Sequence, residues 1–131
     1  MARSKSTKRL SASKKPKPKG ASFADVSKIG CRLPGVAEST SYGTPALKVA
    51  GKLFARLRED GETLVLRCDF VSRDFMLRAE PELFYLTDHY RDYPWILLKL
   101  PEVTTSRLTE LLEDSWRLAA PPRLRQALAD K

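Results

Sequence analysis

Alternating apolar and polar positions in the middle of the chain predict a series of short strands. The alternating segments are rich in apolar and β-branched residues and are separated by turn residues, which is typical of strands. They cover residues 36–42, 46–50, 52–58, 62–69, 84–87 and 95–100. Asp60-Gly61, between the third and fourth segments, is a strong hairpin signal. Because short turns join neighbouring strands, we expect a mainly antiparallel sheet.

Apolar residues at helical spacing flank and interrupt these strands. Ser22-x-x-Asp25 fits a capping box at the start of a helix that Pro34-Gly35 ends. A second helix is expected over 70–79, capped by Asp69 or Ser72. A long third helix is expected with Thr105 or Ser106 as its N-terminal cap, Pro121-Pro122 as its end and room for a short helical tail. The element order predicts a two-layer α+β domain over residues 21–131, with helices covering one face of the sheet.

Positive charge is concentrated at the start of the chain. The 131 residues carry 24 lysines and arginines against 16 acids, a net charge of +8. Eight of the cations and none of the acids lie in residues 1–20, so the remaining 16 cations are balanced by 16 acids in residues 21–131. Leu10 is the one large apolar residue in residues 2–20. We therefore expect residues 1–20 to form a disordered basic tail.

Strand alternation also predicts a basic face on the sheet. In the third strand, Leu53, Ala55 and Leu57 should face the helices and Phe54 should face away. Across the strands, the outward set combines the aromatics Phe54 and Trp95 with six cations: Lys48, Lys52, Arg56, Arg58, Arg67 and Lys99. Cations neutralise phosphates and aromatics stack on bases, so this face is one candidate nucleic-acid platform. The alternative is a solvated sheet face without a ligand.

The sequence offers little that indicates catalysis or metal binding. His89 is the single histidine, and it is interpreted as a loop residue bonded to the backbone. Cys31 and Cys68 are far apart and are expected to be buried hydrophobes. We find no G-x-S-x-G, P-loop or G-x-G-x-x-G motif. We therefore predict a protein that is not an enzyme and needs no cofactor, and we keep a small-ligand site beneath Tyr42, His89 and Trp95 as an option.

A series of short motifs resembles the MmcQ/YjbR family. They span most of residues 22–120 and read Glu38-Ser39, Tyr42-Gly43-Thr44-Pro45, Val49-x-Gly51-Lys52-x-Phe54-Ala55, His89-Tyr90, Trp95 and Leu111-Leu112-x-x-Ser115-Trp116. The resemblance implies a fold similar to the CyaY/frataxin arrangement, a DNA-binding role and no established active site. An iron site like that of frataxins is not expected, because the first helix offers one acid, Asp25.

These observations lead to a functional prediction with one main alternative. We expect a non-catalytic, largely sequence-tolerant nucleic-acid-binding protein, with DNA preferred over RNA as the partner. Its contacts would be the sheet-face cations together with four tail lysines, Lys14, Lys15, Lys17 and Lys19. The alternative is a protein-interaction or scaffold module that uses the loop 88–95. No apolar run is long enough to span a membrane, and the N-terminus lacks the apolar core of a secretory signal, so we expect a cytoplasmic protein, associated with the nucleoid if it binds DNA.

Overall fold

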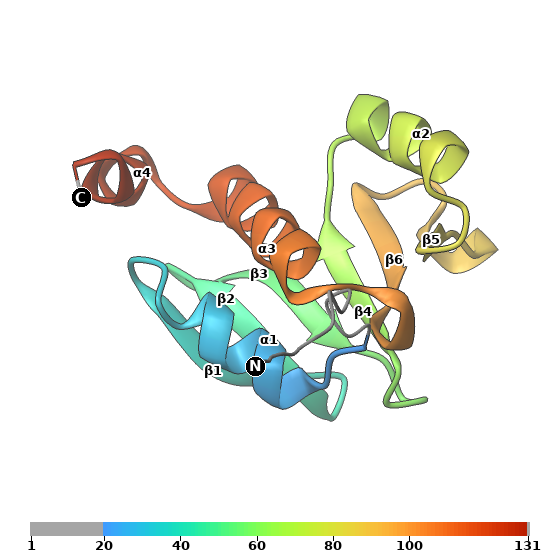
Figure 1. Ribbon diagram of the computed structural model, residues 1–131. Coiled ribbons are helices and arrows are strands. Elements are labelled where there is room, and N and C mark those ends of the chain that lie inside the picture. The colour runs from blue at the N-terminus through green and yellow to red at the C-terminus, as the bar shows by residue number, and fades with distance from the viewer. Residues whose placement is uncertain (1–19, 131) are drawn as a thin grey trace, which may run out of the picture.

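The domain is built on a six-stranded sheet in which every neighbouring pair of strands is antiparallel (Figure 1). The computed structural model describes residues 20–130, so the predicted tail lies outside it except for Gly20. The strand order is β1-β2-β3-β4-β6-β5. The strands are β1 Val36–Ser41, β2 Thr44–Val49, β3 Lys52–Leu57, β4 Thr63–Arg67, β5 Phe84–Tyr85 and β6 Trp95–Lys99. The predicted antiparallel sheet is confirmed.

Helices cover one face of this sheet, as predicted. In Figure 1, α1 (Phe23–Gly30) and α3 (Thr105–Ala119) lie across the same side of the strands, and α2 (Phe70–Ala79) lies near β5 and β6. The short α4 (Pro122–Ala129) follows α3, and two 3-10 turns are formed by Asp88–Tyr90 (η1) and Leu100–Glu102 (η2). None of the helices within residues 20–130 has the length and apolar character needed to cross a bilayer.

The helix termini follow the sequence signals closely. The Asp25 carboxylate accepts a hydrogen bond of 2.9 Å from the Ser22 N–H, which forms the predicted capping box of α1. Asp69 caps α2 by accepting a bond of 2.8 Å from the Ser72 N–H. The cap of α3 is Thr104, one residue before the predicted range, because its hydroxyl accepts from the Arg107 N–H.

The core lies between α1, α3 and the sheet. Trp116 of α3 is completely buried there, and its indole N–H donates to the Pro34 carbonyl at 3.0 Å. This bond ties α3 to the connection between α1 and β1. Ser115, also buried, donates to the Arg67 carbonyl at 2.8 Å and fixes α3 over the end of β4. The polar atoms of this core are thus satisfied by backbone.

Two tight turns fix the register of the first three strands. Tyr42 and Gly43 have φ values of 54° and 79°, and Ala50 and Gly51 have values of 51° and 80°. Two consecutive residues with positive φ form the hairpin loop that matches the twist of the flanking strands. The turns that the sequence predicts at Gly43 and Gly51 are therefore formed by these two hairpin loops.

A β-bulge in β3 overturns part of the predicted face assignment. Leu47 pairs with Ala55 and the next residue, Lys48, pairs with Leu53, so Phe54 is an extra residue without a cross-strand partner. The bulge reverses the alternation on its N-terminal side. Phe54 is completely buried in the helix-side core, and Leu53 turns to the other face. The prediction that Phe54 is an exposed stacking platform is wrong.

Candidate functional site on the second face of the sheet

The second face of the sheet, opposite α1 and α3, carries an unusual set of arginines. It is formed by alternate side chains of β2, β3, β4 and β6: Lys48, Leu53, Arg56, Val65, Arg67, Trp95, Leu97 and Lys99. Val65 and Leu97 are buried on this face although no α-helix of residues 20–130 covers it. Water must therefore be excluded from the centre of this face by its polar side chains and by the segment 88–95 that lies over them.

The guanidinium of Arg56 is hydrogen-bonded within the fold and is not available to bind a phosphate. The residue is 4% exposed, and its three guanidinium nitrogens donate to the Ser41 carbonyl at 3.2 Å, the Tyr90 hydroxyl at 3.1 Å and the Glu59 carboxylate at 2.6 Å. Hydrogen bonding from its own backbone and the nearby Arg56 guanidinium lower the pKa of Glu59. The cation is thus neutralised where the sequence predicted a free positive charge.

Arg67 and Arg58 are also held by neighbouring groups. The Arg67 guanidinium donates twice to the Leu53 carbonyl, at 3.0 and 2.7 Å, and stacks 4.8 Å from the centre of the Trp95 ring. Burial lowers the pKa of Arg67. Arg58 donates to the Tyr85 hydroxyl at 3.4 Å. Arg58 interacts electrostatically with Glu59 and Asp60 and helps to lower the pKa of both carboxyls. Arg67 has no carboxylate ion pair among residues 20–130, so a partial positive potential remains around it on this face.

The predicted lysines are distributed over more than one surface. Lys99 lies over the Tyr85 ring, with its ammonium 5.8 Å from the centre of the ring. Lys48 is half-buried on the second face, whereas Lys52 is exposed and pairs with the core residue Val49, which places it on the helix side of the sheet. Lys14, Lys15, Lys17 and Lys19 lie outside the described residues. The six domain cations therefore do not form the single free patch that was predicted.

The second face instead contains a cavity of about 340 Å³ with aromatic walls, here called the aromatic cavity. Leu53 and Val65 of the sheet lie at its base, with Arg56 beside them. The other lining residues are Tyr42 from the β1–β2 turn and His89, Tyr90, Tyr93 and Trp95. It lies where the sequence left a small-ligand site as an option, beneath Tyr42, His89 and Trp95.

A buried arginine of α2 holds the segment that forms the outer wall of this cavity. Arg73 is 6% exposed, and its guanidinium donates to four backbone carbonyls. The acceptors are Tyr90 at 3.3 Å, Arg91 at 2.9 Å, Tyr93 at 2.8 Å and Trp95 at 3.3 Å. Sequence reasoning missed Arg73, because nothing in the sequence distinguishes it from the exposed Arg78 of the same helix.

Several polar groups of the aromatic cavity have no partner within the described part of the chain. The His89 imidazole contacts the Tyr90 ring edge-on at 4.7 Å but makes no hydrogen bond there, so the predicted bond to backbone is not formed. Asp88 pairs with Arg91 and not with His89. The indole N–H of Trp95 and the hydroxyls of Tyr42 and Tyr93 make no hydrogen bond within residues 20–130. These groups can bind a ligand but form no nucleophile–base pair.

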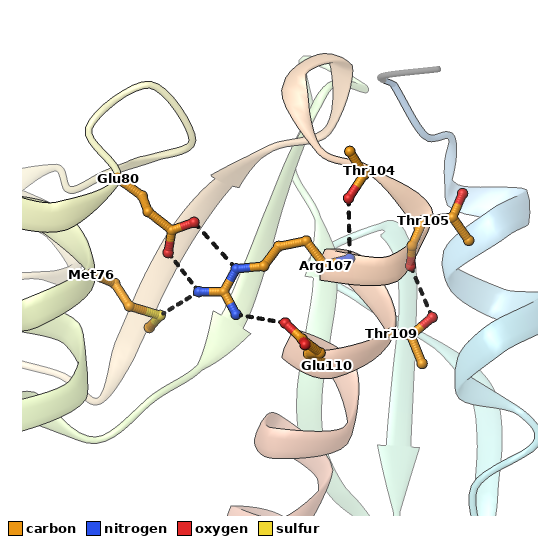
Figure 2. Close-up of polar contacts among 7 residues, drawn as sticks. All are labelled: Met76, Glu80, Thr104, Thr105, Arg107, Thr109 and Glu110. Atoms are coloured by element: carbon orange, nitrogen blue, oxygen red, sulfur yellow. Dashed lines mark hydrogen bonds and ion pairs between the residues drawn. The ribbon is translucent and has the colours of Figure 1, made fainter. Parts of the chain in front are cut away.

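A second depression lies between α2 and α3. It has a volume of about 670 Å³, and its apolar rim includes Val71 and Phe75 of α2 and Leu118 of α3. Arg107 bridges the two helices beside it: its guanidinium pairs with both Glu80 oxygens, at 2.6 and 3.3 Å, and with Glu110 (Figure 2). The bridge fixes the spacing of α2 and α3, and therefore the width of the groove.

The two cysteines differ in their surroundings. Cys68 is buried in the wall of the α2–α3 groove, and burial raises the pKa of its thiol to about 11. The predicted burial of Cys68 is therefore confirmed, and its thiolate is disfavoured. Cys31 is exposed directly after α1, so the prediction that it is a buried hydrophobe is wrong. Within the described residues, no three potential metal ligands are grouped closely enough to hold an ion.

Known proteins share both sequence and fold with this chain. Uncharacterized protein Rv2570 of Mycobacterium tuberculosis and uncharacterized protein Mb2600 of Mycobacterium bovis are each 35% identical to it over 52 residues. That match covers 40% of this chain and 40% of each relative. The crystal structure of Deinococcus radiodurans protein DR2400, which has a DUF419 domain, superimposes with a TM-score of 0.66 at 21% identity. It covers 82% of this chain and 88% of that protein, so the two share a fold.

The family model named YjbR matches residues 31–118. The matched range runs from the end of α1 to the end of α3 and includes the whole sheet, the aromatic cavity and the α2–α3 groove. On this match, the chain belongs to the YjbR family.

Proposed function

We propose that this chain binds nucleic acid without catalysis, with DNA preferred over RNA and with little sequence preference. The observation that carries the proposal is the separation of charge along the sequence. Residues 1–20 hold eight cations and no acid, whereas residues 21–131 are balanced at 16 cations and 16 acids. A polycationic segment of this kind neutralises phosphates and releases counterions without needing a fixed structure.

The structure of the domain supports a leading role for the N-terminal segment. Arg56 is neutralised by Glu59, Arg67 is bonded to backbone, and Lys52 lies away from Lys48. The second face of the sheet therefore has few free cations for a phosphate backbone. Gly20 donates to the Val103 carbonyl at 2.8 Å, which anchors the start of the described chain beside η2. In this proposal the segment supplies affinity, the second face assists it, and the protein acts in the cytoplasm on the nucleoid.

Salt dependence tests the proposal in the full chain. If about six cations of the segment contact phosphates, log K for duplex DNA should fall with log salt at a slope near −5. Replacing Lys14, Lys15, Lys17 and Lys19 by glutamine should flatten the slope by about 3 to 4, since each contact contributes about 0.9. Replacing the exposed domain cations Lys28, Lys52, Arg78 and Arg123 by glutamine is the matched control and should change it little. Equal slopes in the two variants would contradict the proposal.

A protein-interaction module is the second candidate, and the α2–α3 groove favours it. Val71, Phe75 and Leu118 are 82%, 63% and 47% exposed, and they surround one apolar depression. Exposed apolar side chains gathered in this way are typical of protein-binding surfaces. This candidate predicts that DNA is no longer retained at about 0.15 M salt, whereas the first candidate predicts that it is.

A further inference from the structure

The aromatic cavity joins three features that together define a ligand class. It combines apolar floor residues, aromatic walls and polar groups that make no hydrogen bond within residues 20–130. We propose that it binds one planar heterocyclic ring, the unstacked base of a single-stranded nucleic acid. The inference rests on the proposed function and extends it, because it assigns the domain a base-binding role beside the phosphate-binding segment.

The size and shape of the cavity suit one ring system. Its volume of about 340 Å³ is at the lower end of the range for small-molecule sites, about 300–1,000 Å³. Leu53 and Val65 offer an apolar floor, and Tyr93 and Tyr42 stand at its rim, 57% and 85% exposed. A planar ring that enters between these side chains is buried against them and can stack on an aromatic face.

The unbonded polar groups favour a heterocycle over a hydrocarbon ring. The Trp95 indole N–H is a donor, the His89 imidazole offers two ring nitrogens for hydrogen bonds, and the Tyr93 hydroxyl can act as donor or acceptor. None of the three side chains makes a hydrogen bond within residues 20–130, so each is available to a ligand. A nucleobase presents donors and acceptors in the plane of its ring, whereas a hydrocarbon would leave these groups unmatched when it displaced their water.

Charge near the cavity favours a ring that carries a phosphate. Arg56 in its wall is neutralised by Glu59 and contributes little net charge. Arg67 stacks on Trp95, has no carboxylate partner within the described chain, and leaves a positive charge next to the cavity. Lys48 lies on the same face. A phosphate linked to the bound base would therefore experience attraction at this edge.

The arrangement discriminates between single and double strands. A base within a duplex is stacked on both sides and paired along its edge, so it can enter a cavity only after it has been flipped out. An unpaired base has no such cost. The cavity should therefore contribute to single-strand binding and not to duplex binding, whereas the basic segment should contribute to both.

Tryptophan fluorescence of the full chain tests this proposal directly. The chain has two tryptophans, and Trp116 is completely buried in the helix-side core, so a change in emission on ligand binding reports on Trp95. Titrations use a short oligodeoxyadenylate strand, its duplex with the complementary strand, and adenosine monophosphate. The single strand should quench the emission, and the duplex should bind without quenching it.

Two cavity variants and one control complete the experiment. Tyr93→Ala removes a rim ring, and Tyr42→Asn removes another while keeping a residue that accepts positive φ. Each should weaken single-strand binding about tenfold, as expected for the loss of one stacking contact, and leave duplex binding unchanged. Phe75→Ala removes a ring of similar exposure on α2 and should have no effect on either. Circular dichroism establishes that each variant is folded.

The outcomes separate this inference from the proposed function. Unchanged single-strand affinity in both cavity variants, with no quenching, would overturn the cavity assignment, and salt-dependent duplex binding would still support the basic segment. Quenching by adenosine monophosphate that Tyr93→Ala abolishes, in a protein that binds neither form of DNA, would overturn the proposed function and assign the cavity to a free nucleotide.

Discussion

The two faces of the sheet solve the same packing problem with different chemistry. The helix-side face is closed by aliphatic side chains and by Trp116, whose single polar atom is bonded to Pro34. Within residues 20–130 no α-helix covers the second face, and its centre is kept dry by arginines that donate to carbonyls and stack on aromatic rings. The helix-side face is filled beneath α1 and α3 and opens at the α2–α3 groove, whereas the second face retains the aromatic cavity.

This difference shows why a count of lysines and arginines overestimates the positive charge that the second face offers to a ligand. An arginine can bond several acceptors at once and still lie flat against a ring, so it serves as a structural element where an aliphatic side chain would leave carbonyls unsatisfied. Arg56, Arg67 and Arg73 each act in this way. Most of the arginines on this face thus have a structural role. A ligand can contact only those charged groups that are not already bonded within the fold.

The largest expected effect comes from opening the helix-side face. Trp116→Ala removes a completely buried ring and leaves a cavity, so the free energy of unfolding should fall by about 3–5 kcal/mol. Phe75→Ala, which removes a 63% exposed ring, should change it by less than about 0.5 kcal/mol. Urea denaturation measures both values. A small effect of Trp116→Ala would mean that α3 does not close this core.

A smaller effect is expected when the arginine support of the second face is removed. Arg73→Met deprives four backbone carbonyls of a charged donor and should lower the free energy of unfolding by about 2–3 kcal/mol. The segment 88–94 should also exchange its amide hydrogens faster, because Arg73 holds its backbone in place. Arg78→Met changes an exposed arginine of the same helix and is the control for both measurements. Equal exchange in the two variants would refute this anchoring role.

The smallest expected effect is a loss of stability at alkaline pH, caused by the burial of the Cys68 thiol on the helix side of the sheet. The folded-state pKa of Cys68 is raised from its ordinary value of 9.0 to about 11, so the folded protein keeps a proton that the unfolded chain releases. Stability should therefore be complete below about pH 9 and decline as the pH rises, by about 1 kcal/mol between pH 8 and 10. Cys68→Ala should remove this part of the decline, whereas Cys31→Ser should retain it. Identical pH profiles for the two variants would place Cys68 in contact with water.

Features that depend on short-range interactions agree with the predictions from the sequence, whereas features that depend on distant segments do not. The capping box at Ser22, the cap at Asp69 and the turns at Gly43 and Gly51 depend on neighbours within a few residues, and all were found. Phe54 was misplaced because one extra residue in β3 reverses the alternation, and that bulge depends on how β3 pairs with β2. Arg73 was missed because the carbonyls that it binds lie 17 to 22 positions away.

The element order, the antiparallel α+β class and the separation of the basic segment from a neutral domain can be predicted from the sequence. These features follow from local periodicity, turn chemistry and composition, which need no knowledge of distant contacts, and the family follows from the resemblance of short motifs. The three-dimensional packing is needed to show which cations are free, that the second face is held by arginine–carbonyl bonds, and that aromatic residues from the β1–β2 turn and the segment before β6 meet around one cavity. Burial and hydrogen bonding depend on which distant segments pack together, and in this protein they change the role of a positive charge from ligand contact to structural support.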